Sequence, residues 1–238
     1  MQEKIAKEDY YVYDFALPML LINALYYGQT QYLKHWFEIC PRKQFTTLDT
    51  HDGIGVVDVK DLLPDEEIGR TKEDIFKFGA NVKKIYNTAA YNNLDIYQVN
   101  CSYYSALGDE DDAYLLARAV QFFAPGIPQV YYVGLLAGKN DLKLLEETKV
   151  GRNINRHYYT KEEIDAEVKR PVVAELLRMM EFRNAHPAFD GTFELENSDD
   201  DKLVIVRRNG DAWAKLSADF KVKKFTITYT EDGEVHTF

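Results

Sequence analysis

Hydrophobic and polar positions along this 238-residue chain change their spacing near residue 190. Before that point, short apolar runs alternate with longer segments whose apolar side chains recur every three or four residues, a pattern typical of strands alternating with helices. The short runs predict strands over residues 10–15, 45–48 and 128–133. Because helical segments separate them, these strands are expected to lie parallel in one sheet of an α/β fold.

The helical segments of this first part carry recognisable starts. A proline in the first turn, or a threonine followed three residues later by an acidic residue, commonly begins a helix. Such starts are found at Pro18, at Thr71 with Asp74, at Thr160 with Glu163, and at Pro171. A further helix is expected over residues 111–123, whose Ala, Leu and Arg content favours helix.

From Gly191 onward the apolar side chains alternate with period two, which predicts strands. The expected strands are 192–195, 203–207, 212–216 and 225–229. Asn209–Gly210 and Asp232–Gly233 are expected to form two-residue hairpin turns between such strands. The sequence therefore predicts two domains: an α/β part over residues 1–189, and a small antiparallel β domain over 190–238.

Composition and charge exclude several classes of protein. Asp and Glu number 39 against 29 Lys and Arg, and the net charge of -10 repels nucleic acid and acidic membrane surfaces. No apolar run approaches the length of a membrane span, and the charged amino terminus lacks the apolar core of a secretory signal. Cys40 and Cys101 show no Cys-x-x-Cys spacing, which is typical of buried thiols in a reducing compartment. We therefore expect a cytoplasmic protein that binds neither nucleic acid nor membranes.

The stretch from Phe45 to Asp58 contains the first candidate site. Its strand delivers His51 and Asp52 to the carboxyl end, where the loops of parallel sheets collect functional side chains. An Asp-Gly pair is also an ordinary turn signal, so a purely structural turn is an alternative. Asp49, His51 and Asp52 could also hold a metal ion, although their spacing matches no established ligand pattern.

Two polar segments, residues 87–99 and 151–159, are predicted to be loops. The first is rich in Asn and turn-forming residues, and loops of this length are often functional. The second is basic in an acidic protein. It is either a solvated surface loop or a second wall of a site at the same end of the sheet.

Six sequence motifs carry a family resemblance. They are Val12-Tyr-Asp-Phe-Ala-Leu-Pro18, Leu48-Asp-Thr-His-Asp-Gly-Ile-Gly55, Asn93-Leu-Asp-Ile-Tyr-Gln-Val-Asn100, Ser102-Tyr-Tyr-Ser-Ala-Leu-Gly108, Pro128-Gln-Val-Tyr-Tyr-Val-Gly134 and Gly151-Arg-Asn-Ile-Asn-Arg-His157. With them the chain resembles, over nearly its whole length, the carboxyl-terminal half of the sucrose phosphorylases, a family of the α-amylase-like glycoside hydrolase clan. The His-Asp pair is shared by the whole clan, whereas the motifs at 93–100 and 151–157 are far more specific.

The resemblance implies a partial (β/α)8 barrel, strands six to eight with their helices, followed by the small antiparallel β domain. Enzymes of this family transfer glucose from sucrose to phosphate, giving glucose 1-phosphate and fructose with retention at the anomeric carbon, and they need no cofactor. They use a carboxylate nucleophile, which forms a covalent glucosyl-enzyme, and a carboxyl acid/base. In the family these two groups lie on strands four and five, which this sequence lacks, so the chain alone is predicted to be inactive.

The same resemblance implies roles for residues of this chain. Asp52 would be the carboxylate that stabilises the transition state, and His51 and Arg152 would bind the glucose hydroxyls, with Arg152 also pairing with Asp52. The acceptor side, which holds fructose or admits phosphate, would be formed by Leu94, Asp95, Tyr97 and Gln98. The absence of a basic side chain between residues 88 and 100 favours sucrose over a phosphorylated analogue.

Three barrel strands leave two open sheet edges and an apolar inner face, which a soluble protein has to cover. The expected partner is an amino-terminal half-barrel, in the same chain or a separate one, or a second copy of this chain. Two other hypotheses stay open: a catalytically silent carbohydrate-binding or oligomerisation piece, and an unrelated metal-dependent hydrolase.

Overall fold

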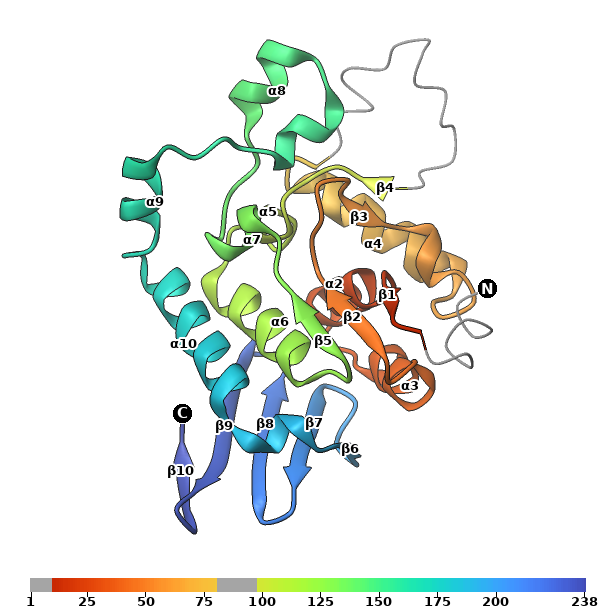
Figure 1. Cartoon of the computed structure of the whole chain (residues 1–238). Coiled ribbons are helices and arrows are strands. Elements are labelled where there is room, and N and C mark those ends of the chain that lie inside the picture. The colour runs from red at the N-terminus through yellow and green to blue at the C-terminus, as the bar shows by residue number, and fades with distance from the viewer. Residues whose placement is uncertain (1–9, 81–97) are drawn as a thin grey trace.

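The computed structural model describes residues 10–80 and 98–238, and its first part contains a parallel sheet. Three strands, β1 (Val12–Asp14), β2 (Gln44–Thr47) and β5 (Ile127–Gln129), lie in the order β1-β2-β5 (Figure 1). Both pairings are parallel. The predicted sheet is therefore confirmed: β1 and β5 are shorter than expected, and β2 begins one residue earlier with the expected length.

The prediction of a strand reaching residue 133 is wrong. The chain leaves the sheet after Gln129, and Tyr132–Leu135 form the short helix α7, which buries Val133 in the core. A short apolar run is compatible with a buried strand or with a buried helix, and its periodicity alone does not separate the two.

Helices connect and cover these strands. Their bounds are α2 (Leu17–Tyr27), α3 (Gln31–Ile39), α4 (Asp65–Lys77), α5 (Tyr103–Ala106), α6 (Asp111–Phe123), α8 (Leu142–Thr148), α9 (Lys161–Glu167) and α10 (Pro171–Ala185), with 3-10 turns η1 (Val57–Val59), η3 (Gly151–Asn155) and η4 (Pro187–Asp190). The helices predicted at Pro18, 111–123 and Pro171 are present, and Thr160 with Glu163 forms the expected capping box. Among the described residues, no helix is long and apolar enough to cross a bilayer.

The predicted helix start at Thr71 is wrong. Helix α4 begins at Asp65, directly after Pro64, and its first turn carries three acidic side chains, which the positive end of the helix dipole favours. Thr71 is buried within the helix, where its hydroxyl accepts a hydrogen bond of 3.0 Å from the Asn23 side chain. In the sequence, apolar residues at helical spacing continue from Ile75 and Phe78 to Val82 and Ile85, and the last two lie outside the described residues.

Asp14 joins the end of β1 to the start of α2. Its carboxylate Oδ1 accepts the backbone N–H groups of Ala16 and Leu17 at 3.1 and 3.0 Å, and its Oδ2 accepts the indole N–H of Trp36 at 3.0 Å. Burial raises the pKa of Asp14 to about 6, although these three donors act in the opposite direction. A buried, hydrogen-bonded carboxylate thus fixes the first strand-to-helix connection.

The remainder of the chain is a five-stranded antiparallel sheet, one strand more than predicted. Its strands are β6 (Thr192–Glu196), β7 (Lys202–Asn209), β8 (Ala212–Asp219), β9 (Lys224–Glu231) and β10 (Glu234–Thr237), in the order β10-β9-β8-β7-β6. Asp232–Gly233 form the expected hairpin loop, with positive φ angles of 51° and 81°. Asn209 pairs with Ala212, so the other two-residue loop is Gly210–Asp211, one position later than predicted.

Helix α6 packs against both sheets and lies beside β5 and above the antiparallel strands in Figure 1. One continuous cluster of buried side chains runs from α2 through α6 and α10 to Ile227 of β9. The side chain of Arg207 on β7 is also buried and donates to the carbonyl oxygens of Phe189 and Gly191 at 3.1 and 3.4 Å. The boundary predicted at residue 190 therefore separates two kinds of element that share a core, and it stays a prediction as a domain boundary.

One face of the parallel sheet is apolar and exposed. Tyr13, Phe45 and Ile127 occupy matching positions on the three strands, so their side chains point to the same side. Tyr13 is 44% exposed and Ile127 is 46% exposed, and the rings of Tyr13 and Phe45 lie 5.5 Å apart. We call these three residues the inner-face row. Large apolar side chains gathered in this way are typical of a surface that meets another protein segment.

Candidate functional site

The loop that follows β2 is held in place by its own turn and by a neighbouring strand. Strands β3 (Ile54–Gly55) and β4 (Gln98–Val99) pair antiparallel beside it. Gly53 has a φ of 109°, and a Cβ atom there would lie 2.4 Å from the carbonyl oxygen of Val99, so only glycine fits. Asn100 donates from its side-chain amide to the carbonyl oxygen of Asp52 at 2.8 Å. The backbone that carries Asp52 is thus fixed against β4.

His51 and Asp52 project from this loop as a pair. The distance from His51 Nε2 to Asp52 Oδ2 is 3.4 Å. The side chain of His51 is 67% exposed and that of Asp52 is 33% exposed, so both can reach a ligand. The sequence prediction that these two groups stand at the carboxyl end of a parallel strand agrees with their position after β2.

Arg152 comes to this pair from a segment 100 residues later. It lies on η3, and its Nη1 atom is 3.0 Å from Asp52 Oδ1. Its side chain remains 47% exposed, which leaves guanidinium N–H groups free to reach a neighbouring molecule. The structure therefore brings together His51, Asp52 and Arg152, as the sequence analysis expected.

Two residues of the same segment were missed from the sequence. Asn155 is buried and donates from its side-chain amide to the carbonyl oxygen of Thr50 at 2.9 Å. Arg156 donates from Nε to the carbonyl oxygen of His51 at 2.8 Å, and its Nη2 atom lies 3.5 Å from Asp52 Oδ1. The signals for them were the basic, Asn-rich composition of residues 151–157 and the family motif that these residues form, neither of which gave the two residues a role.

Asp49 lies apart from this group. Its Oδ2 atom accepts a hydrogen bond of 2.7 Å from Arg118, and both side chains are almost fully buried. Gly134 packs against the pair so closely that a Cβ atom there would lie 1.9 Å from Asp49 Oδ2. A carboxylate paired with a guanidinium is unsuited to share a metal ion with His51 and Asp52. Nor do residues 10–80 and 98–238 contain any group of three or more His, Cys, Asp or Glu side chains that could hold one.

The predicted acceptor residues are only partly described. Leu94, Asp95 and Tyr97 lie outside the described residues. Gln98 is half-buried on β4, where it pairs with Gly55. The last of the four residues therefore lies on the strand that adjoins the His51–Asp52 loop.

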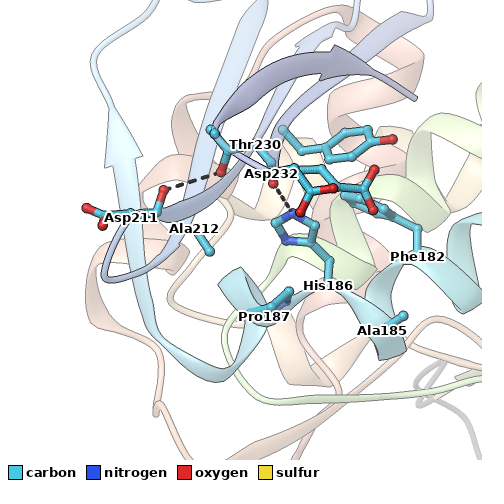
Figure 2. A pocket seen from close by; sticks show the side chains of 11 residues that line it. Phe182, Ala185, His186, Pro187, Asp211, Ala212, Thr230 and Asp232 are labelled. Atoms are coloured by element: carbon cyan, nitrogen blue, oxygen red, sulfur yellow. Dashed lines mark hydrogen bonds between the residues drawn. The ribbon is translucent and has the colours of Figure 1, made fainter.

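A separate pocket of about 600 Å³ lies between the end of α10 and strands β8 and β9 (Figure 2). Its charged lining residues are the acidic Asp211, Glu231 and Asp232, without lysine or arginine. Its histidine, His186, is held by the backbone: Nε2 lies 2.8 Å from the carbonyl oxygen of Thr230, and Nδ1 lies 3.3 Å from the N–H of Ala188. The pocket therefore offers no lysine or arginine for a phosphate and no free imidazole.

No family model matches the chain, but individual proteins are similar to it. The sucrose phosphorylase of Streptococcus mutans is 58% identical over all of this chain and 50% of its own length. The glucosylglycerol phosphorylase of Marinobacter adhaerens is 46% identical over 98% of this chain and 49% of its own length. The chain spans about half the length of the curated relatives it matches.

Two solved structures also match this chain over somewhat less than half of their own length. The crystal structure of sucrose 6F-phosphate phosphorylase from Thermoanaerobacter thermosaccharolyticum superposes with a TM-score of 0.93 and 41% identity, over all of this chain and 49% of that one. An α-amylase from H. orenii superposes with a TM-score of 0.58 over 92% of this chain and 42% of that one, at 14% identity. The second likeness shows the fold alone: part of the (β/α)8 barrel of the α-amylase family with a carboxyl-terminal β domain.

Proposed function

Because this chain is homologous to the carboxyl-terminal half of the sucrose phosphorylases, we propose that it forms the glucose-binding wall of such an enzyme. The reaction is the transfer of glucose from sucrose to phosphate, which gives glucose 1-phosphate and fructose with retention. One observation carries the proposal. Segments 100 residues apart in the chain bring Arg152 and His51 onto the single carboxylate of Asp52.

Asp52 is the charged centre of this wall. Its Oδ1 atom is buried beside Arg152 and its Oδ2 atom faces His51, so we expect Oδ2 to accept the sugar hydroxyl. Hydrogen bonds of this kind strengthen as the glucose ring flattens and gains positive charge, so they favour the transition state over bound sucrose. Arg152 and His51 add donors for the same hydroxyls.

The bond-breaking groups come from outside this chain. A carboxylate nucleophile attacks the anomeric carbon as the bond to the fructose oxygen breaks, and an acid/base carboxyl delivers its proton to that oxygen. Phosphate then attacks the glucosyl ester, releases the nucleophile and gives its proton to the acid/base. We place both groups on the strands that complete the barrel, so this chain alone is inactive.

The inner-face row supports this completion. Tyr13, Phe45 and Ile127 expose apolar surface, and within the described residues β1 and β5 each have only β2 as a neighbour. A half-barrel, in the same polypeptide or a separate one, would pair with both edges and cover the row. Self-association would cover the row without supplying the two missing carboxyl groups, and the chain would then be a silent carbohydrate-binding piece.

The relatives include a glucosylglycerol phosphorylase and a sucrose 6F-phosphate phosphorylase as well as sucrose phosphorylases. Among these substrates we favour sucrose for this chain. Residues 88–100 carry no basic side chain to hold a second phosphate. Leu94, Asp95, Tyr97 and Gln98 would form this acceptor side. The two cysteines are buried and unpaired, which agrees with a reducing, cytoplasmic location.

The decisive experiment joins the chain to the missing half of the barrel. The amino-terminal half of the Streptococcus mutans relative is co-expressed with this chain, and glucose 1-phosphate formation from sucrose and phosphate is measured. We expect activity from the pair and none from either part alone. Asp52→Asn should abolish it, whereas Asp61→Asn, at an exposed carboxylate of positive φ that Asn also tolerates, should not. A stable complex without turnover, together with sucrose binding by calorimetry, would support the silent carbohydrate-binding alternative.

A further inference from the structure

We propose that Arg156 is a positioning residue that holds Asp52 in its working orientation, so that Arg152 is free to bind the substrate. The inference rests on the function proposed above and adds a residue that neither the resemblance nor the comparisons assign. It begins from the two guanidinium groups that face the same carboxylate oxygen, Asp52 Oδ1, at 3.0 Å from Arg152 and 3.5 Å from Arg156.

The two arginines differ in what else they bind. Arg156 donates from Nε to the carbonyl oxygen of His51 at 2.8 Å, which ties its guanidinium to the backbone of the loop. Arg152 has no such backbone bond among the described residues, and it is 47% exposed against 27% for Arg156. A rigid, planar guanidinium that donates to a carbonyl and faces a carboxylate as an ion pair holds the two groups in one relative orientation. Arg156 is therefore placed to orient the Asp52 carboxylate, and Arg152 is placed to contact the substrate.

The residues around Arg156 support this division. The neighbouring Asn155 donates to the carbonyl oxygen of Thr50 at 2.9 Å, so two consecutive residues of the 151–157 segment bind two consecutive carbonyl groups of the loop. Within the loop, the N–H of Asp52 donates to Thr50 Oγ1 at 3.1 Å. The backbone around Asp52 is thus held by these bonds, and of the two arginines that face its carboxylate, Arg156 is the less exposed and is itself bonded to the loop backbone.

The first test uses the chain alone and does not depend on activity. Hydrogen exchange of the Asp52 amide is compared in wild type, Arg156→Gln and Arg152→Gln. We expect Arg156→Gln to speed exchange at least about fivefold, because the loop loses its anchor at His51, while Arg152→Gln changes it less than about twofold. Equal exchange in the two variants would overturn the inference even if the complemented enzyme proved inactive.

The second test uses the complemented enzyme and separates positioning from mere structural support. Arg156→Gln removes the hydrogen bond from the charged guanidinium to the His51 carbonyl, and a bond with a charged partner is worth about tenfold to a hundredfold in rate, so kcat for sucrose should fall by that factor. The KM for sucrose should change less than about threefold. Arg156→Lys, which keeps the charge but not the fork, should restore part of kcat, whereas Arg152→Gln should raise KM as well. An unchanged kcat in Arg156→Gln would refute the inference, and an inactive wild-type pair would instead refute the proposed function.

Discussion

Asp14 makes the stability of this protein depend on pH in a calculable way. Burial raises the pKa of its carboxyl to about 6 from an ordinary value of 3.8. The folded state therefore holds the proton more tightly than the unfolded state, so Asp14 adds stability in full below pH 3.8 and loses this contribution as the pH rises through 6. A shift of about two pKa units corresponds to roughly 3 kcal/mol over the whole range, and about 2 kcal/mol falls between pH 4.5 and 7.

Asp14→Asn tests this reasoning because an amide does not titrate. The amide oxygen can still accept the N–H groups of Ala16 and Leu17, but its NH₂ group would face the indole N–H of Trp36, donor against donor. A buried donor without a partner costs about 1–3 kcal/mol, and this cost does not depend on pH. The variant should therefore be less stable than wild type at pH 4.5 and recover about 2 kcal/mol relative to it at pH 7.

The assay is urea unfolding followed by circular dichroism at both pH values, since urea leaves the charges unscreened. Asp61→Asn, at an exposed carboxylate, serves as the control and should follow wild type at both. The reasoning is refuted if the difference in unfolding free energy between wild type and Asp14→Asn stays constant within about 0.5 kcal/mol from pH 4.5 to 7. Burial would then not raise the pKa of the Asp14 carboxyl.

Three further predictions follow from the site and its surroundings. Asp52→Asn should lower turnover of the complemented enzyme by several powers of ten and leave its urea midpoint unchanged, and a near-normal rate would remove Asp52 from the mechanism. Gly134→Ala should cost about 3 kcal/mol or more in urea unfolding by splitting the buried ion pair, whereas the helical Gly69→Ala, with open space around it, should gain up to about 1 kcal/mol. Ile127→Asp should leave the circular dichroism spectrum intact but abolish co-purification with the amino-terminal half-barrel; unchanged co-purification would exclude the inner-face row from that contact.

Local patterns in the sequence predicted the elements whose ends carry a clear chemical signal. The proline starts, the Thr160–Glu163 capping box and the Asp232–Gly233 turn are all present where expected. The start at Thr71 failed because a buried threonine and a capping threonine look alike until a partner such as Asn23 is known. Signals that depend on a distant residue are invisible in a single stretch of sequence.

The site shows the same limit at longer range. Motif resemblance placed His51, Asp52 and Arg152 in one site, and the structure brings them together. It gave no role to Arg156, because that role depends on a backbone carbonyl 105 positions away, which has no side-chain signature. Carbonyl acceptors are the same in every residue, so only the fold reveals which arginine binds one.

The close approach of Gly53 to β4 links the two ends of the proposed substrate. Leu94, Asp95, Tyr97 and Gln98 are predicted to form the acceptor side, and β4, which begins at Gln98, carries Val99 against Gly53 and leads to Asn100, which holds the carbonyl of Asp52. We expect occupancy at the acceptor side to change the affinity for glucose, and by thermodynamic linkage glucose must change acceptor affinity by the same factor. We expect Asn100 to carry this coupling, because it follows β4 directly and its side chain binds the carbonyl of Asp52, the residue proposed to bind the transferred glucose.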